Sequence, residues 1–164
     1  MTQKFYVTDR DMRKYLAEIT RQITVDGFNP DVIIGPGRGA FIMGVMLSHY
    51  YDKPFHGFEW QTRDHEMIQN STRLETILSL FKSKNILIVD DINDSGTTLL
   101  GIDEVVNDFD KSENNNNFYL HEQIKYATLF SKESSNFDKV EFTSNVMEPD
   151  NDPWIVFPYE EWWK

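Results

Sequence analysis

The sequence predicts an α/β protein, a single domain with a mainly parallel twisted sheet flanked by helices. Three observations lead to this class. Short apolar segments suited to buried strands alternate with segments of helical spacing. Two of the apolar segments run into a glycine turn and then into a helical segment, the order typical of parallel strands. The length of 164 residues corresponds to one unit, residues 1–164.

A helix is expected before the first predicted strand. Thr8 can cap it, and Asp11 three residues later completes the pattern of a capping box. The apolar side chains that follow have the spacing of one helical stripe: Met12, Tyr15, Leu16, Ile19 and Ile23. Gly27 and Pro30 then end the helix.

The next segments follow the order strand, turn, helix. Residues 31–35 (DVIIG) predict a strand, the turn PGRG follows, and residues 40–51 have helical character. Residues 55–60 (FHGFEW) predict another strand. The polar stretch 61–73 has little periodicity, so we expect a mobile loop there.

The same order recurs in the second half of the chain. Residues 85–89 (NILIV) predict a buried strand, and residues 99–109 a helix. Residues 110–117, with four consecutive asparagines, are expected to form an exposed insertion that buries nothing. Residues 124–131 and 140–146 predict two further strands, and the tail 153–163 is rich in aromatic residues. Ligands of such sheets bind at the carboxyl ends of the strands.

Composition limits the possible partners. The chain has 27 acidic and 16 basic residues, a net charge of −11, which disfavours nucleic acid as a partner. No apolar run is long enough to cross a bilayer, so no membrane association is expected. The N-terminal residues lack a signal peptide, and we expect a cytoplasmic protein. The absence of cysteine excludes disulfides and cysteine zinc sites.

The segment ILIVDDINDSGTTL, residues 86–99, places three carboxylates within five residues, directly after the predicted strand. Asp90, Asp91 and Asp94 repel one another unless cations or donors bind them, which indicates a functional site. A helix cap explains one of them at most. A calcium-binding loop fails because Ile102 stands where the bidentate glutamate belongs. The following hydroxyls, with Gly96 and a helix N-terminus, suit a phosphate.

This segment resembles the signature of type I phosphoribosyltransferases, which bind phosphoribosyl pyrophosphate (PRPP). The resemblance implies that Asp90 and Asp91 bind the ribose hydroxyls, with Mg²⁺ as the cofactor. It implies that the 5-phosphate is held by a loop of five residues: Asp94, Ser95, Gly96, Thr97 and Thr98. In the 6-oxopurine branch of the family, the residue matching Asp94 is the catalytic base that faces N7 of the purine.

The turn GPGRGA has two interpretations. Gly35, Gly37 and Ala40 satisfy the dinucleotide fingerprint, with Glu59 as the ribose-binding acid, so a nicotinamide-dependent oxidoreductase is the main rival. In the resembled family, this turn is the pyrophosphate loop, formed here by Gly37, Arg38 and Gly39. Arg38 can donate two hydrogen bonds to the leaving pyrophosphate. The rival leaves the three aspartates unexplained.

The C-terminal part resembles the purine pocket of bacterial and archaeal 6-oxopurine enzymes. The segments YATLFSK and PWIVFPYEEW imply that Lys132 donates to O6 of the base, that Trp154 stacks on it, and that Ile155 contacts its far edge. The resemblance thus implies a core sheet over residues 31–131 and a small C-terminal, purine-binding hood over residues 132–164. The loop 61–73 departs from the family pattern, and Arg63 is its candidate for reaching the pyrophosphate.

The sequence therefore predicts a transferase that moves ribose 5-phosphate from PRPP onto hypoxanthine, guanine or xanthine, giving a nucleoside monophosphate and pyrophosphate. A homo-oligomer, dimer or tetramer, is expected. The other alternative is a PRPP-binding regulator without catalysis. Such a regulator need not keep Lys132 or Trp154, and one that binds nucleic acid needs a basic surface, which this composition does not provide.

Overall fold

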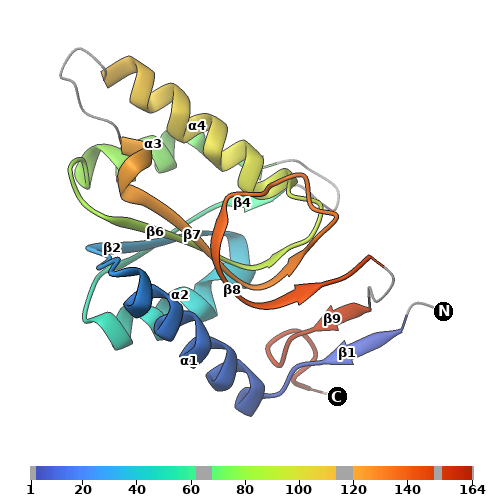
Figure 1. The fold of residues 1–164 in the computed structure, drawn as a ribbon. Coiled ribbons are helices and arrows are strands. Elements are labelled where there is room, and N and C mark those ends of the chain that lie inside the picture. The colour runs from blue at the N-terminus through green and yellow to red at the C-terminus, as the bar shows by residue number, and fades with distance from the viewer. Residues whose placement is uncertain (1–2, 62–67, 114–119, 150–152, 164) are drawn as a thin grey trace.

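The computed structural model describes residues 3–61, 68–113, 120–149 and 153–163. At its centre lies a five-stranded sheet in which every neighbouring pair is parallel, in the order β3, β2, β6, β7, β8 (Figure 1). Its strands are β2 (Val32–Pro36), β3 (Phe55–Phe58), β6 (Ile86–Asn93), β7 (Ile124–Lys132) and β8 (Val140–Met147). This arrangement confirms the predicted fold class.

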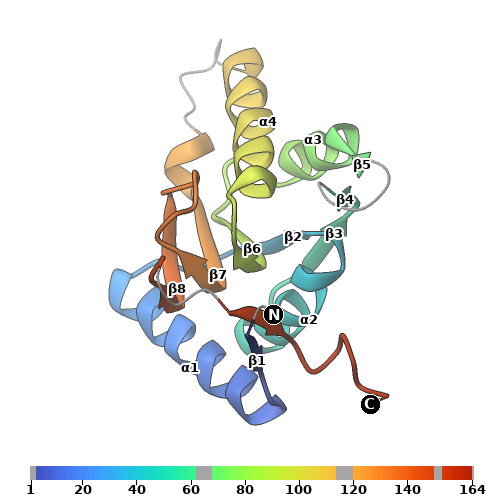
Figure 2. The same cartoon turned by 90° about the vertical axis from the view of Figure 1, so that its right-hand side faces the viewer.

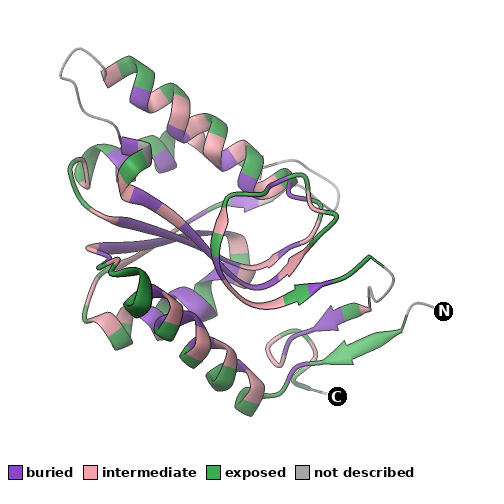
Figure 3. Cartoon of the chain, in the orientation of Figure 1, coloured by how far each residue is buried: buried purple, intermediate pink, exposed green. Residues whose placement is uncertain are grey.

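Helices cover both faces of this sheet. Helices α1 (Asp9–Asp26) and α2 (Gly37–Tyr51) lie on one face, and α3 (Ser71–Leu80) and α4 (Thr97–Glu113) on the other, as Figures 1 and 2 show. Alternate residues of a strand therefore enter different cores: in β2, Ile33 packs with α1 and α2, whereas Val32 and Ile34 pack on the side of α3 and α4. The central strands are buried on both faces (Figure 3), which explains their continuous apolar sequences.

The predicted first helix is confirmed as α1. The Thr8 hydroxyl accepts a hydrogen bond from the Asp11 amide (3.1 Å), and the Asp11 carboxylate accepts one from the Thr8 amide (3.0 Å). The Thr8 hydroxyl also donates to the Asp11 carboxylate (2.6 Å), and this bond, followed by the one from the Thr8 amide, lowers the pKa of Asp11. Gly27 ends the helix in the left-handed conformation (φ 81°).

Two small sheets and a short helix complete the fold. Strand β1 (Lys4–Tyr6), which the sequence did not predict, pairs in parallel with β9 (Trp154–Val156). Strands β4 (Trp60–Gln61) and β5 (Ile68–Gln69) pair antiparallel. A 3₁₀ helix, η2 (Leu120–Gln123), precedes β7.

The prediction of a loop over residues 61–73 is wrong for its described part, because β5 and the first turn of α3 fall within it. The Asn70 side chain accepts a hydrogen bond from the Arg73 amide and so caps α3. Buried Leu74, Ile77 and Leu78 attach this helix to the core. Arg63 lies outside the described residues.

The insertion predicted at residues 110–117 is also wrong in part. Its first four residues form the last turn of α4, and Asp110 is buried, where its carboxylate accepts a hydrogen bond from the Leu120 amide (2.8 Å). Asp110 thus joins the end of α4 to η2. Residues 114–119 lie outside the described part of the chain.

The central sheet extends further along the chain than the expected range 31–131, because β8 belongs to it. Strand β6 also extends past Val89, since its pairing with β7 continues to Asn93 and Ser131. The division into a core and a purine-binding hood over 132–164 stays a prediction. None of the helices in the described ranges is long and apolar enough to cross a membrane.

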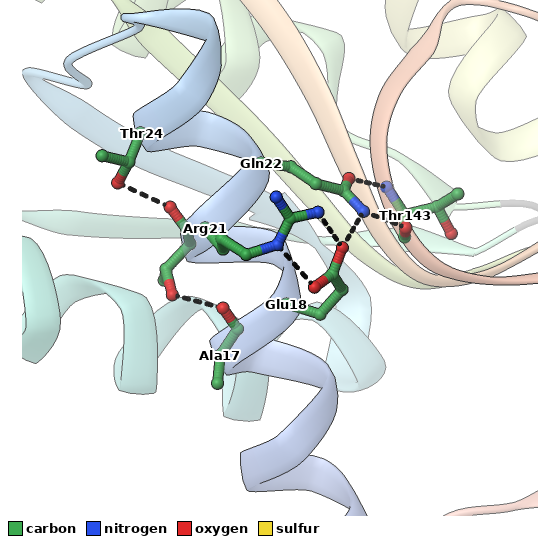
Figure 4. Close-up of polar contacts among 7 residues, drawn as sticks. Ala17, Glu18, Arg21, Gln22, Thr24 and Thr143 are labelled. Carbon is green, nitrogen blue, oxygen red and sulfur yellow. Dashed lines mark hydrogen bonds and ion pairs between the residues drawn. The ribbon is translucent and has the colours of Figure 1, made fainter.

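Gln22 of α1 completes the exposed edge of the sheet at β8. Its side-chain amide donates to the carbonyl oxygen of Thr143 (2.9 Å) and accepts from the Thr143 amide (3.1 Å), as Figure 4 shows. The same amide nitrogen of Gln22 also donates a hydrogen bond to the Glu18 carboxylate (2.9 Å), which forms an ion pair with Arg21. Gln22 therefore bonds β8 as a neighbouring strand would, and it protects this edge.

We predict that Gln22→Ala lowers the free energy of unfolding by about 1–2 kcal/mol, because two hydrogen bonds to the β8 backbone are lost. Chemical denaturation measures this difference. Gln3→Ala, a change in an exposed side chain at the start of the described chain, is the matched control and should stay within about 0.5 kcal/mol of the parent. Equal stability of the two variants would contradict the role of Gln22.

Candidate active site

A cavity of about 750 Å³ opens at the carboxyl ends of β2 and β6. Residues from α2, β4, β6, α4 and the C-terminal segment line it. Of the described residues that the sequence assigned to the phosphates and the ribose, all contribute to this lining: Gly37, Arg38, Gly39, Asp90, Asp91, Asp94, Ser95, Gly96, Thr97 and Thr98. The structure therefore brings both glycine turns to one place, as expected for ligand sites of parallel sheets.

The two turns are built differently from the prediction. Helix α2 begins at Gly37, not at Ala40, so Arg38 and Gly39 lie in its first turn. Asp90 and Asp91 lie within β6, not after it. Pairing with β7 extends β6 to Asn93, and α4 begins at Thr97, so residues 94–96 form the link between β6 and α4.

Gly96 allows the link between β6 and α4 to pass close to the loop after β7. It has φ +83°, and a Cβ atom here would lie 2.5 Å from the Phe137 amide nitrogen and 2.7 Å from the Ser135 hydroxyl. The Asn136 amide donates to the Ser95 carbonyl oxygen (3.1 Å) in the same contact. The loop after β7 thus supports the turn whose hydroxyls and helix N-terminus suit a phosphate.

Asn93 joins the same support and was missed by the sequence analysis. Its buried side chain donates to the Ser131 hydroxyl (3.0 Å) and the Phe137 carbonyl oxygen (2.9 Å), and it accepts from the Ser135 hydroxyl (2.7 Å). Asn93 therefore fixes the end of β6 relative to the end of β7, directly before Asp94.

Asp91 is enclosed by two parts of the cavity wall. A Cβ atom at Gly39 would lie 2.1 Å from its Oδ2, so only glycine fits there. The Tyr159 hydroxyl donates to the same oxygen (2.7 Å). Burial raises the pKa of Asp91, and the hydrogen bond from Tyr159 opposes this effect. Burial, followed by the charge of Asp91, raises the pKa of Tyr159, which therefore keeps its proton near neutral pH.

Lys132 and Asp94 form an ion pair beside the cavity, in which Asp94 is a lining residue and Lys132 is not. Lys132 Nζ lies 2.6 Å from Asp94 Oδ1, and both side chains are largely buried, with 15% and 25% of their surfaces exposed. Lys132 is the last residue of β7, and Asp94 follows the last residue of β6. The pair places a cationic donor beside an anionic acceptor at one edge of the cavity.

Trp154 and Ile155 do not belong to the cavity lining. Trp154 is 54% exposed on β9, where its amide donates to the Gln3 carbonyl oxygen (2.7 Å), and Ile155 is buried. Several lining residues had no role in the sequence prediction: Pro36, Trp60, Ile92, Asn93, Leu99, Tyr159, Glu160 and Trp163. Glu59, which the sequence analysis named only for the dinucleotide alternative, also lines the cavity. The high content of aromatic residues in the tail was the feature of the sequence that could have indicated Tyr159 and Trp163 as lining residues.

The charges in the cavity suit an anion only if a cation accompanies it. Among its described lining residues, Arg38 is the only base, against five acids: Glu59, Asp90, Asp91, Asp94 and Glu160. Within the described ranges, no three potential ligands gather in the geometry of a metal site. Mg²⁺ commonly uses one or two protein carboxylates and completes its shell with substrate oxygens and water. Asp90 and Asp91 fit that requirement.

The fold and the cavity define an α/β protein with a candidate ligand site at the carboxyl ends of its parallel strands. The family description "Phosphoribosyl transferase domain" matches residues 7–162. The chain therefore belongs to the phosphoribosyltransferase family, the family that the β6 motif indicated. The dinucleotide interpretation of the GPGRGA turn is not supported by this family.

Individual relatives agree with this assignment. The adenine phosphoribosyltransferase of Methanococcus vannielii is 29% identical over 104 residues, which cover 57% of this chain and 60% of the relative, less than two thirds of its length. A purine phosphoribosyltransferase from Pyrococcus horikoshii is 25% identical with a TM-score of 0.67, covering 97% and 95% of the two chains. The Helicobacter pylori xanthine-guanine-hypoxanthine enzyme shares the fold at 20% identity (TM-score 0.66; 98% and 95%).

We predict that Gly96→Ala lowers the free energy of unfolding by about 2–4 kcal/mol, from left-handed strain and from the clash with Phe137. Gly27→Ala is a matched control, because Gly27 has nearly the same φ and no atom within 4 Å of the added Cβ. It should lose only about 1 kcal/mol. Denaturation curves of both variants give the difference, and equal losses would show that the Phe137 contact is unimportant.

Proposed function

We propose that the protein transfers ribose 5-phosphate from PRPP to a 6-oxopurine base, giving a nucleoside monophosphate and pyrophosphate. The observation that carries the choice of base is the ion pair of Lys132 and Asp94, 2.6 Å apart. In its N7–H form, a 6-oxopurine presents an acceptor, O6, beside a donor. This pattern is complementary to an ammonium group beside a carboxylate.

PRPP would lie across the two turns. The hydroxyls of Ser95, Thr97 and Thr98, at the N-terminus of α4, would hold the 5-phosphate, where the helix dipole favours an anion. Arg38, exposed at the start of α2, would donate to the pyrophosphate, which carries the charge that develops as the bond to the ribose breaks.

Asp90 and Asp91 would hold the ribose hydroxyls and Mg²⁺. The bound ion would supply positive charge to the pyrophosphate as it leaves. The acidic lining of the cavity supports this requirement, since a polyphosphate alone would be repelled there.

The base would be oriented by Lys132 and deprotonated at N7 by Asp94 while N9 attacks the ribose. Binding of the base would replace their mutual contact with one hydrogen bond from each group to the purine, so neither buried charge is left without a hydrogen-bond partner. The exposed ring of Trp154 would stack on the base, and the Ile155 backbone would contact its far edge.

We also propose a homo-oligomer, dimer or tetramer, in the cytoplasm. Support for the oligomer comes from α2, which exposes Phe41, Ile42, Val45 and Tyr50. Exposed apolar side chains on one helix favour association. The lack of cysteine fits a reducing compartment.

Incubation of the protein with PRPP, Mg²⁺ and each base tests the function. We expect a nucleotide from a 6-oxopurine and none in excess chelator. Asp94→Asn should bind PRPP but lose about 10²–10⁴ in rate, because the amide keeps the shape and lacks basicity. The Asp94→Asn variant also serves as a control for contaminating activity, because a contaminating enzyme would be unaffected by this substitution. Binding of PRPP without product from any base would favour the regulator, and unchanged turnover in Asp94→Asn would contradict its role.

We predict that Lys132→Met removes the preference for 6-oxopurines. The ammonium group only donates hydrogen bonds, so it opposes the amino group that adenine presents in place of O6. The parent should prefer hypoxanthine over adenine in kcat/KM by as much as about 10⁴. Steady-state kinetics with both bases measures this ratio. If the parent uses adenine equally well, or the variant keeps the preference, Lys132 does not select the base.

A further inference from the structure

Tyr159 connects the C-terminal segment to β6. Its hydroxyl donates to Oδ2 of Asp91 at 2.7 Å, across 68 positions of sequence, and both residues line the cavity. Neither the motif of β6 nor the resemblance of the C-terminal segment gives a role to Tyr159. The contact therefore needs its own explanation.

The position of Tyr159 is fixed by the turn that contains it. The Phe157 amide donates to a Glu160 carboxylate oxygen (2.8 Å), and the Glu160 amide donates to the Phe157 carbonyl oxygen (3.0 Å). Buried Phe157 stacks on the Tyr159 ring, with centroids 5.3 Å apart and planes at 3°, and it meets Phe130 of β7 edge to face at 5.9 Å. The core thus holds the hydroxyl of Tyr159 at one point.

The opposite side of Asp91 is equally restricted. Its carboxyl group lies against the Gly39 backbone, at the start of α2, where there is no space for even a methyl group. Between Gly39 and Tyr159 the carboxylate has little rotational freedom. A carboxylate that is already ordered loses less entropy when it binds a ligand, and hydrogen bonds from outside the ligand shell commonly provide this order.

We propose that Tyr159 is a positioning residue that holds the Asp91 carboxylate in its orientation for binding PRPP and magnesium. This inference rests on the proposed function, because it takes Asp91 to be a ligand of that substrate. It makes the C-terminal segment part of the PRPP site as well as of the base site. A purely structural role, such as anchoring the tail, would act whether or not Asp91 is present.

Tyr159→Phe removes the hydroxyl and keeps the ring that stacks on Phe157. We expect the Kd for PRPP, measured by calorimetry on the full chain in excess Mg²⁺, to rise about tenfold, since a hydrogen bond to a charged group is lost. The KM for PRPP should rise in step, with little change in kcat. Tyr6→Phe is the matched control: Tyr6 is exposed on β1 and does not line the cavity, and its change should leave the Kd unaltered.

A double-mutant cycle separates positioning from structural support. In an Asp91→Ala background, Tyr159→Phe should change the Kd by less than about twofold, because the hydroxyl has lost its acceptor. If Asp91→Ala binds too weakly to measure, Asp91→Asn replaces it. There the hydrogen bond is to a neutral acceptor, about half as strong, so the effect of Tyr159→Phe should fall to about threefold.

The outcomes distinguish this inference from the proposed function. If the parent does not bind PRPP with Mg²⁺, the proposed function fails, and this inference fails with it. If the parent binds PRPP and Tyr159→Phe binds it equally well, only the role of Tyr159 is overturned. A tenfold effect that persists in the Asp91 variants also overturns it, because Tyr159 would then act independently of Asp91.

Discussion

The parallel pairing of β6 with β7 is the constraint on which the rest of the structure depends. The register runs from Ile86 and Ile124 at one end to Asn93 and Ser131 at the other. Because the strands are parallel, both finish at the same edge of the sheet, and residues that follow β6 meet residues at the end of β7. The pair of Asp94 and Lys132 is a direct consequence of this register. A shift of one position would turn alternate side chains to the opposite face and separate the pair.

Groups that lower the stability of the fold lie together at the edge of the sheet where β6 and β7 end. Carboxylates gather beside one another, and the polypeptide comes close enough that only glycine fits at Gly39 and Gly96. Such conflicts are tolerated at functional sites because the surrounding core holds them in place. Here the surrounding core is apolar on both faces of the sheet. These unfavourable contacts are therefore confined to one edge of the sheet, where ligands of parallel sheets bind.

The fold does not decide which base is used, because one fold serves several substrates and specificity resides in single side chains. The relatives include an adenine enzyme and a xanthine-guanine-hypoxanthine enzyme. In the proposed function, the base is selected by the donor at Lys132 and by the C-terminal segment. That segment is attached to the core through Phe157, and Tyr159 links it to the opposite wall of the cavity.

The sequence by itself determined the features that are local. The cap formed by Thr8 and Asp11, the apolar runs of β2, β6 and β7, and the motif at residues 90–98 are all visible within short windows, because capping and periodicity act over a few residues. Helix α3 also carried such a signal, the Asn70 cap before Leu74, Ile77 and Leu78, which the sequence analysis missed.

Only the tertiary structure decided the contacts between distant segments. The hydrogen bonds of Gln22 to Thr143 cross 121 positions, and those of Tyr159 to Asp91 and of β1 to β9 also join remote parts of the chain. The tertiary structure also decided the lengths of β6 and α4. Pairing with β7 extends β6 beyond its apolar pattern, and burial of Asp110 extends α4 beyond its own. Local periodicity cannot specify these features, because each depends on which surface the packed core brings opposite.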